Sequence, residues 1–105
     1  MLKHLKSNEF EKEVIRSERV ILVDFFATWC PPCKMLSPVL EKIAISRAEF
    51  DIAKVNIDEE QDLAVKYQIQ AVPTMLVFKD GKPVDKLVGY VDENIILNTI
   101  DKHIL

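Results

Sequence analysis

The chain contains two cysteines, Cys30 and Cys33, which are separated only by Pro31 and Pro32. They lie in the segment DFFATWCPPCKM, residues 24 to 35, directly after an apolar run and directly before a helical pattern. Two thiols at this spacing can form a structural disulfide, supply half of a metal site, or exchange electrons as a redox pair. The residues around the pair decide among these chemistries.

The remaining potential ligands do not favour a metal site. Structural zinc takes four ligands, usually from a second cysteine pair or from histidines. The only histidines, His4 and His103, lie at opposite ends of the chain. A permanent disulfide closing so short a loop would stabilise the fold little, and such bonds are rare in reducing compartments. We therefore favour a redox-active pair over a structural one and expect no bound metal.

The position of the pair supports redox chemistry. Cys30 falls near the position that caps the predicted helix, where unpaired backbone N–H groups and the helix dipole favour an anion. We expect this to lower the pKa of Cys30 and to make it an exposed, attacking thiolate. Cys33 lies one turn further on and is expected to be the buried, resolving thiol. Pro31 and Pro32 fit the first helical turn, where a missing N–H costs nothing.

The composition is that of one compact domain. The 105 residues are 49% hydrophobic and 30% charged, with a net charge of −3. We predict a single domain over residues 1 to 105, with an apolar core large enough to need no disulfide framework. Acids and bases are interspersed, so nucleic acid and anionic membranes are not expected as partners. With no export signal or apolar membrane span in the sequence, we expect a cytoplasmic monomer.

Helical and strand patterns alternate along the chain. An α/β fold is predicted, with a central mixed sheet flanked by helices on both faces. In order, the predicted elements are a helix over 8 to 16 capped by Ser7, a buried strand over 20 to 26, a long helix after the cysteines kinked at Pro38, a strand over 50 to 58, a helix over 59 to 67, a hairpin over 73 to 90 turning at Asp80 and Gly81, and a helix from Asp92 onward.

A charged residue interrupts the first buried strand. Asp24 stands between VILV and FF, where an ionised carboxylate would cost several kcal/mol unless it found a partner. We expect a raised pKa or a cation beside it, and Lys54 on the next predicted strand is the expected partner. Such a carboxylate can accept the proton of Cys33 during exchange. The alternative is that Asp24 points to solvent from the strand end.

At these residues the sequence resembles the thioredoxin family. The matching segments are VDFFATWCPPCKMLSP (23 to 38), AKVNIDE (53 to 59), VPTMLVFKDGK (72 to 82) and VGY (88 to 90). The resemblance implies the thioredoxin fold and a protein-disulfide reductase, a thiol–disulfide oxidoreductase of intracellular redox homeostasis. It also implies no bound cofactor, disulfide-containing target proteins as substrates, and a thioredoxin reductase as the electron source.

The resemblance also implies roles for individual residues. Cys30 and Cys33 match the catalytic pair, and Asp24 and Lys54 match the buried polar pair behind Cys33. A cis bond between Val72 and Pro73 is implied as well. The residues that match the surface for a substrate peptide are Trp29, Pro31, Val72, Pro73, Thr74 and Gly89.

The sequence departs from the family at two places. Pro31 stands where the family usually has glycine, so one possible N–H donor near Cys30 is lost, and we expect a slightly more reducing protein. The segment QIQA, residues 68 to 71, replaces a glycine-rich turn. Two other functions stay open: an oxidase or isomerase of the same fold, and a non-catalytic binding module.

Overall fold

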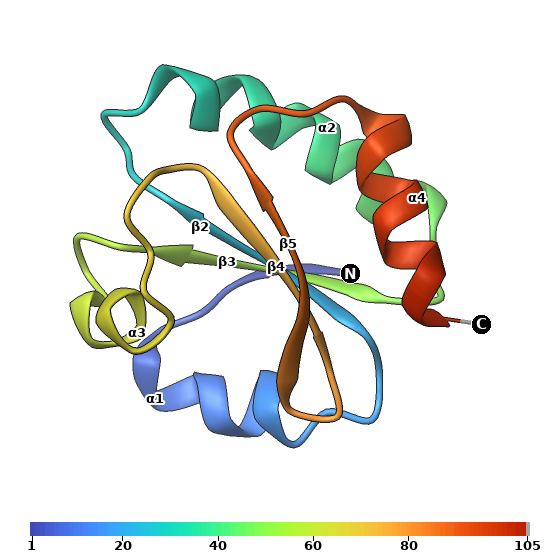
Figure 1. Ribbon diagram of the computed structural model, residues 1–105, viewed down its shortest axis with the longest axis horizontal. Helices are drawn as coiled ribbons and strands as arrows, with labels where there is room; N and C mark the ends of the chain where they lie inside the picture. Colours follow the sequence, from blue (N-terminus) through green and yellow to red (C-terminus); the bar gives the residue numbers. More distant parts are fainter. Residues whose placement is uncertain (105) are drawn as a thin grey trace.

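A five-stranded mixed sheet forms the centre of the molecule in the computed structural model, which describes residues 1–104 (Figure 1). The strand order is β1-β3-β2-β4-β5. Strands β1, β3 and β2 are parallel to one another, and β4 is antiparallel to both of its neighbours, β2 and β5. The strands are β1 (Leu2–His4), β2 (Ile21–Phe26), β3 (Asp51–Asn56), β4 (Thr74–Lys79) and β5 (Lys82–Val88). The predicted mixed sheet is therefore confirmed. Leu105, the last residue of the predicted domain, lies outside the described residues.

Helices cover both faces of this sheet, as predicted. Figure 1 shows α2 and α4 on one face and α1 and α3 on the other. Their bounds are α1 (Ser7–Phe10), which continues into the π-helical turn η1 (Glu11–Ile15), then α2 (Pro31–Ser46), α3 (Gln61–Lys66) and α4 (Glu93–Ile104). No helix within residues 1–104 is long and apolar enough to cross a membrane.

The alternation of side chains along the strands produces two cores. Successive strand residues point to opposite faces, so the three inner strands β2, β3 and β4 supply both cores. The core under α1 and α3 contains Phe10, Val14, Ile21, Val23, Phe25, Ala53, Val55, Leu63, Leu76 and Phe78. The core under α2 and α4 contains Leu22, Leu36, Leu40, Ile43, Phe50, Ile52, Met75, Val77, Ile96 and Ile100. The buried face of α2 contains Leu36, Leu40 and Ile43, which recur at helical spacing in the sequence.

The prediction that Ser7 caps the first helix is wrong. Lys6 occupies the cap position, and its backbone N–H donates to the Glu9 carboxylate at 2.9 Å. Ser7 is the first helical residue, and its N–H and hydroxyl both donate to Glu60 Oε1, at 3.0 and 3.2 Å. The Ser7 side chain, which the local sequence pattern assigned to the cap, therefore bonds to Glu60, a residue distant in sequence.

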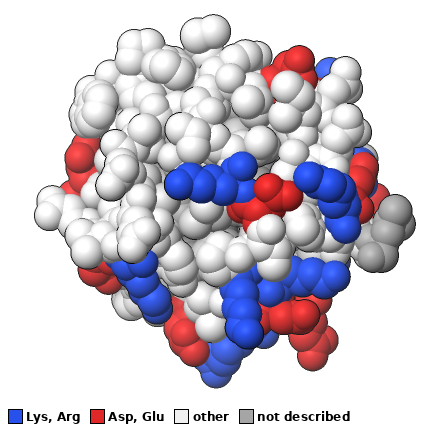
Figure 2. Space-filling model, in the orientation of Figure 1, with Lys and Arg blue, Asp and Glu red and all other residues white. Residues whose placement is uncertain are grey.

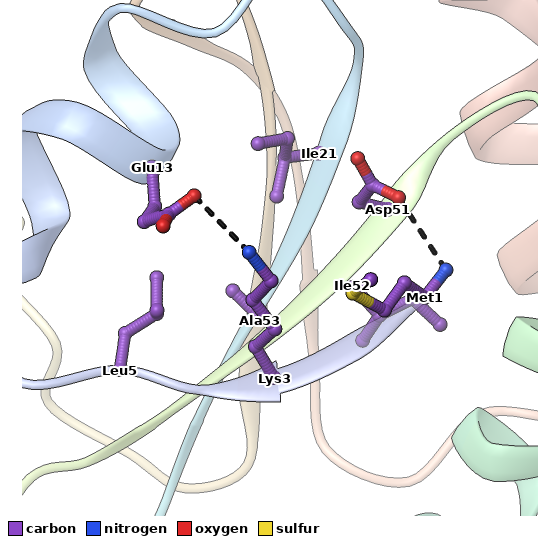
Figure 3. Close-up of a pocket in the computed structure, with 8 residues that line it drawn as sticks. All are labelled: Met1, Lys3, Leu5, Glu13, Ile21, Asp51, Ile52 and Ala53. Atoms are coloured by element: carbon purple, nitrogen blue, oxygen red, sulfur yellow. Dashed lines mark hydrogen bonds and ion pairs between the residues drawn. The ribbon is translucent and has the colours of Figure 1, made fainter.

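Strand β1 was not predicted. It is only three residues long, too short for an alternating pattern, and it pairs in parallel with β3. Lys3 Nζ contacts Glu13 at 3.3 Å and the N-terminal amine contacts Asp51 at 3.4 Å, so charges hold this edge strand on both sides. Figure 3 shows these two ion pairs around a cavity of about 110 Å³ between β1, β2, β3 and η1.

Helix α2 runs without interruption through Pro38, so the proline lies inside a single helix. Its C-terminal end is fixed to α4, because the Arg47 guanidinium donates to Asp101 Oδ1 at 2.6 Å. The predicted start of α4 at Asp92 is also supported: the Asp92 carboxylate accepts the N–H of Ile95 at 3.1 Å. The contact between Arg47 and Asp101 joins the two helices that lie on this face of the sheet.

The predicted turn between β4 and β5 is confirmed. Asp80 and Gly81 both adopt positive φ, 52° and 78°, as a tight two-residue hairpin turn requires. A Cβ placed on Gly81 would lie 2.7 Å from the backbone oxygen of Ile15. Gly81 therefore satisfies both the turn and the close approach of η1.

We predict that Gly81→Ala destabilises the protein clearly more than Gly89→Ala. Both glycines have positive φ, so either alanine incurs the strain of the left-handed region, about 1 kcal/mol. Only at position 81 does the new methyl group also meet a backbone atom, because nothing lies within 4 Å of a Cβ at position 89. Urea unfolding of the two oxidised variants measures the difference, and equal losses would contradict the packing argument.

Candidate functional site

Cys30 caps α2 with its sulfur atom. Its backbone is extended, at φ −98° and ψ 107°, and the helix begins at the next residue. The backbone N–H of Cys33 donates to Cys30 Sγ at 3.2 Å. Pro31 and Pro32 have no N–H, so Cys33 supplies the first backbone donor of this turn. The predicted placement of Cys30 at the helix cap is confirmed, and the two cysteines form a disulfide.

Both cysteines are buried in this oxidised form. Cys30 is 2% exposed and Cys33 is 4% exposed, so the expectation of an exposed Cys30 is wrong for the disulfide state. The reason is the segment that precedes β4: the Val72 carbonyl oxygen lies 3.6 Å from Cys30 Sγ. Ala27 and Val72 pack around the pair. The sulfur that sequence reasoning placed at the surface thus lies beneath a neighbouring loop.

The segment beside Cys30 has the predicted cis bond, between Val72 and Pro73. The Pro73 carbonyl accepts the N–H of Gly89 at 2.8 Å, which ties this segment to the end of β5. Thr74 donates its hydroxyl to the Ala71 carbonyl at 2.6 Å. The structure therefore places Val72 next to the disulfide and ties the following Pro73 to Gly89, although these residues are distant from the cysteines in sequence.

Trp29 flanks the site on the surface. Its side chain is 66% exposed, and the indole N–H donates to Asp58 Oδ2 at 2.9 Å. Asp58 is oriented in turn, because its N–H donates to Asn56 Oδ1 at 2.9 Å. Sequence reasoning missed Asp58 as a site residue, although the acidic stretch after the second predicted strand was a signal. Pro31 is also exposed beside the pair.

Asp24 is fully buried and has no hydrogen-bond partner within residues 1–104. Burial raises the pKa of Asp24 from 3.8 to about 7, and the positive charge of Lys54 partly opposes this rise. The raised pKa was predicted. The alternative that Asp24 points to solvent is wrong, because the residue is fully buried on β2, which pairs with β3 on one side and β4 on the other.

Lys54 is the register partner of Asp24 on β3 and is 6% exposed. The expected direct ion pair is nevertheless absent among the described residues. Instead, Lys54 Nζ donates to Ser37 Oγ at 3.0 Å and lies 4.7 Å from the centre of the Phe26 ring. Sequence reasoning missed Ser37, which lies one helical turn after Cys33; that spacing was the available signal.

A cavity of about 250 Å³ lies beside Cys33. It is lined by Phe26, Ala27, Thr28, Cys33, Lys34, Ser37 and Lys54. Its hydroxyl and ammonium groups and its size suit water molecules, which need several polar partners. No cluster of metal-ligating side chains occurs within residues 1–104.

The surface around the start of α2 carries few charges. Figure 2 shows uncharged atoms over the β2–α2 junction and the loop before β4, in the upper left of the view. Basic and acidic side chains gather instead over β5 and the lower part of this face. The disulfide therefore lies below a largely uncharged surface.

A disulfide at the N-terminus of a helix, beneath a surface that carries few charges, defines a thiol–disulfide oxidoreductase. A family model described as Thioredoxin matches residues 1–102. The thioredoxin of Staphylococcus aureus strain Mu50 is 49% identical over 86 residues, which are 81% of this chain and 83% of that protein. The thioredoxins of strains MW2 and N315 match to the same extent. The chain therefore belongs to the thioredoxin family, and its Cys30–Cys33 pair performs dithiol–disulfide exchange.

We predict that stability falls with rising pH because of Asp24. In the unfolded chain this carboxyl loses its proton near pH 3.8, whereas in the folded chain it keeps the proton up to about pH 7. The folded form thus binds more protons between these values, so the free energy of unfolding decreases as pH rises from about 4 to 7. The difference corresponds to a loss on the order of 4 kcal/mol above pH 7.

Asp24→Asn should remove this decrease, because its side chain is neutral at every pH. Urea unfolding of the oxidised proteins at a series of pH values measures the effect. Asp80→Asn, in an exposed turn, is the matched control and should keep the decrease of the parent protein. A decrease that persists unchanged in Asp24→Asn would contradict the assignment.

Proposed function

We propose that the protein is a reductase of disulfides in other proteins, with Cys30 as the attacking thiolate. In the first step the Cys30 thiolate forms a bond to one sulfur of a target disulfide, and the other target sulfur leaves as a thiolate. In the second step Cys33 attacks Cys30 Sγ and releases the remaining target sulfur. The target gains two electrons, and the Cys30–Cys33 disulfide forms.

The observation that carries this proposal is the cap contact between the Cys33 N–H and Cys30 Sγ at 3.2 Å. A donor that faces a sulfur in the disulfide also faces the thiolate left after reduction, and it stabilises the anion more strongly than the neutral thiol. The N-terminus of α2 adds its positive potential. Cys30 is therefore the favoured nucleophile of the pair.

Asp24 is proposed as the proton acceptor for Cys33. A carboxyl with a pKa near neutrality takes up and releases protons at physiological pH, as a general base must. Lys54, the register neighbour of Asp24, lines the same cavity as Cys33, and we propose that the transfer passes through water in that cavity. These assignments retain the catalytic roles predicted for Cys30, Cys33, Asp24 and Lys54.

The target segment is proposed to lie across the uncharged surface beside the disulfide. Trp29 and Pro31 offer exposed side chains on one side of the site. On the other side Pro73 and Thr74 are buried, so this part of the surface is shaped mainly by backbone held in place by Gly89. A surface with few charges suits many different target segments.

Electrons are proposed to come from a thioredoxin reductase, with no cofactor bound to this chain. The whole chain, residues 1 to 105, is proposed to act as one domain and as a monomer. A cytoplasmic location stays a prediction.

Insulin reduction with and without a thioredoxin reductase tests the activity and the electron source together. Alkylation of the cysteines should abolish insulin reduction. A chain that reduces no insulin, and whose binding to its partners survives alkylation, would instead indicate a binding module.

We predict that the two cysteine variants behave differently with a disulfide-containing protein. Cys33→Ser should perform the first step and then stop, because no thiol remains to resolve the mixed disulfide. It should therefore accumulate a covalent adduct on a non-reducing gel. Cys30→Ser should form little adduct, and both variants should lose insulin reduction. Equal adduct formation by the two variants would contradict the assigned order of attack.

We predict that Pro31→Gly raises the reduction potential. Glycine restores a backbone N–H near Cys30, and one hydrogen bond of about 1 kcal/mol to the thiolate would stabilise the reduced form. The expected change is about 20 mV toward a more oxidising value. Redox titration measures it, with Pro38→Ala, further along α2, as the control. An unchanged or a lower potential in Pro31→Gly would contradict the prediction.

A further inference from the structure

The ammonium group of Lys54 is held by a hydroxyl rather than by a carboxylate. Its Nζ donates to Ser37 Oγ at 3.0 Å and lies 4.7 Å from the centre of the Phe26 ring. A cation over an aromatic face is attracted to that face, so both contacts act on the same charge. Lys54 and Asp24 are the only buried charged side chains among residues 1–104.

The other buried acceptor available to this ammonium is the carboxylate of Asp24. Asp24 and Lys54 are paired in register on neighbouring strands, and both carboxylate oxygens lack a partner in the described chain. A buried anion with no hydrogen bond attracts a neighbouring cation strongly, because water does not screen the pair. Even so, no ion pair joins Lys54 to Asp24 in the described chain. Some contact must therefore favour the position that the ammonium occupies.

We propose that Ser37 is a positioning residue, whose hydroxyl anchors the Lys54 ammonium at the cavity beside Cys33 and keeps it out of contact with Asp24. Ser37 lies on α2 one turn after Cys33, so the helix that carries the resolving thiol also carries the anchor. Cys33, Ser37 and Lys54 line one cavity, which places the anchored charge next to the resolving thiol. Only the kinetic consequence of this role rests on the proposed function.

The other charged groups around Lys54 lie at the surface. Lys34 lines the same cavity from α2. A second cavity, of about 340 Å³, borders Lys54 and is also lined by His4, Lys6, Glu9 and Glu59. All five of these side chains are exposed, so solvent and salt screen their action on Asp24. The buried ammonium is thus the charge that acts most strongly on the pKa of Asp24. A single substitution on α2 can change its position.

Removal of the Ser37 hydroxyl should move the charge toward Asp24. In Ser37→Ala the ammonium loses its acceptor, and the Asp24 carboxylate becomes the strongest acceptor within reach. An opposite charge in direct contact favours the ionised form, so the pKa of Asp24 should fall by about one unit. Carboxyl carbon NMR of the oxidised protein measures this midpoint directly. A midpoint that is unchanged or higher in Ser37→Ala would overturn the proposal.

Three further variants make the result specific. Ser37→Thr keeps a hydroxyl at the same position and should retain the parent midpoint. Ser46→Ala removes another serine of α2, whose hydroxyl donates only to the Ile43 carbonyl of the same helix, and should also retain it. In a Lys54→Met background, Ser37→Ala should no longer change the midpoint. A change that persists without the ammonium would show that Ser37 does not act through Lys54 and would overturn the proposal.

The kinetics separate this proposal from the proposed role of Asp24. The rate at which Cys33 resolves a mixed disulfide is measured against pH for the parent protein and for Ser37→Ala. If Asp24 accepts the proton, the midpoint of this profile should move to lower pH together with the NMR midpoint. An NMR midpoint that moves while the rate profile stays in place would support the positioning role and overturn the role of Asp24 as proton acceptor.

Discussion

The sulfur of Cys30 occupies a position that a side-chain oxygen usually fills at the start of a helix. The contact from the Cys33 N–H requires β2 to end, the chain to turn and α2 to begin within a few residues. It also requires a stable platform, which the two cores on opposite faces of the sheet provide. The segment around Val72 then closes over the disulfide from the other side. The chemistry of the pair depends on this one cap geometry.

The buried polar residues behind the site reduce stability while they support function. A carboxyl group without a partner in the middle of β2 costs free energy once it ionises, and a hydrophobic residue there would fit both neighbouring strands. The lysine opposite does not neutralise it, because a serine of α2 takes its hydrogen bond. The protein thus keeps a carboxyl group whose pKa is close to neutral pH, at the cost of its own stability. Such a conflict between local rules and fold is typical of functional sites.

Much of the fold and the site was predictable because the controlling interactions are local. Apolar residues on both faces identify β2 and β3 as central strands, and Asp80 with Gly81 identifies the turn that joins β4 to β5. What the sequence did not reveal depends on contacts between distant segments. Strand β1 is too short to show a pattern, the first cap passes from Ser7 to Lys6, and the burial of Cys30 depends on a loop some forty residues away. The partner of Lys54 was missed because the one signal for Ser37, its spacing of one helical turn from Cys33, does not show that it contacts a residue of β3.

The largely uncharged surface over the start of α2 has a consequence for how partners arrive. Long-range attraction between opposite charges speeds the encounter of many protein pairs, and dissolved salt weakens it. Where the contact area carries few charges, encounter rates should depend little on ionic strength and little on the sign of the partner's charge. Selection among partners would then occur after collision, through shape and through the accessibility of their own sulfur–sulfur bonds. A carrier of this kind can serve acidic and basic proteins alike.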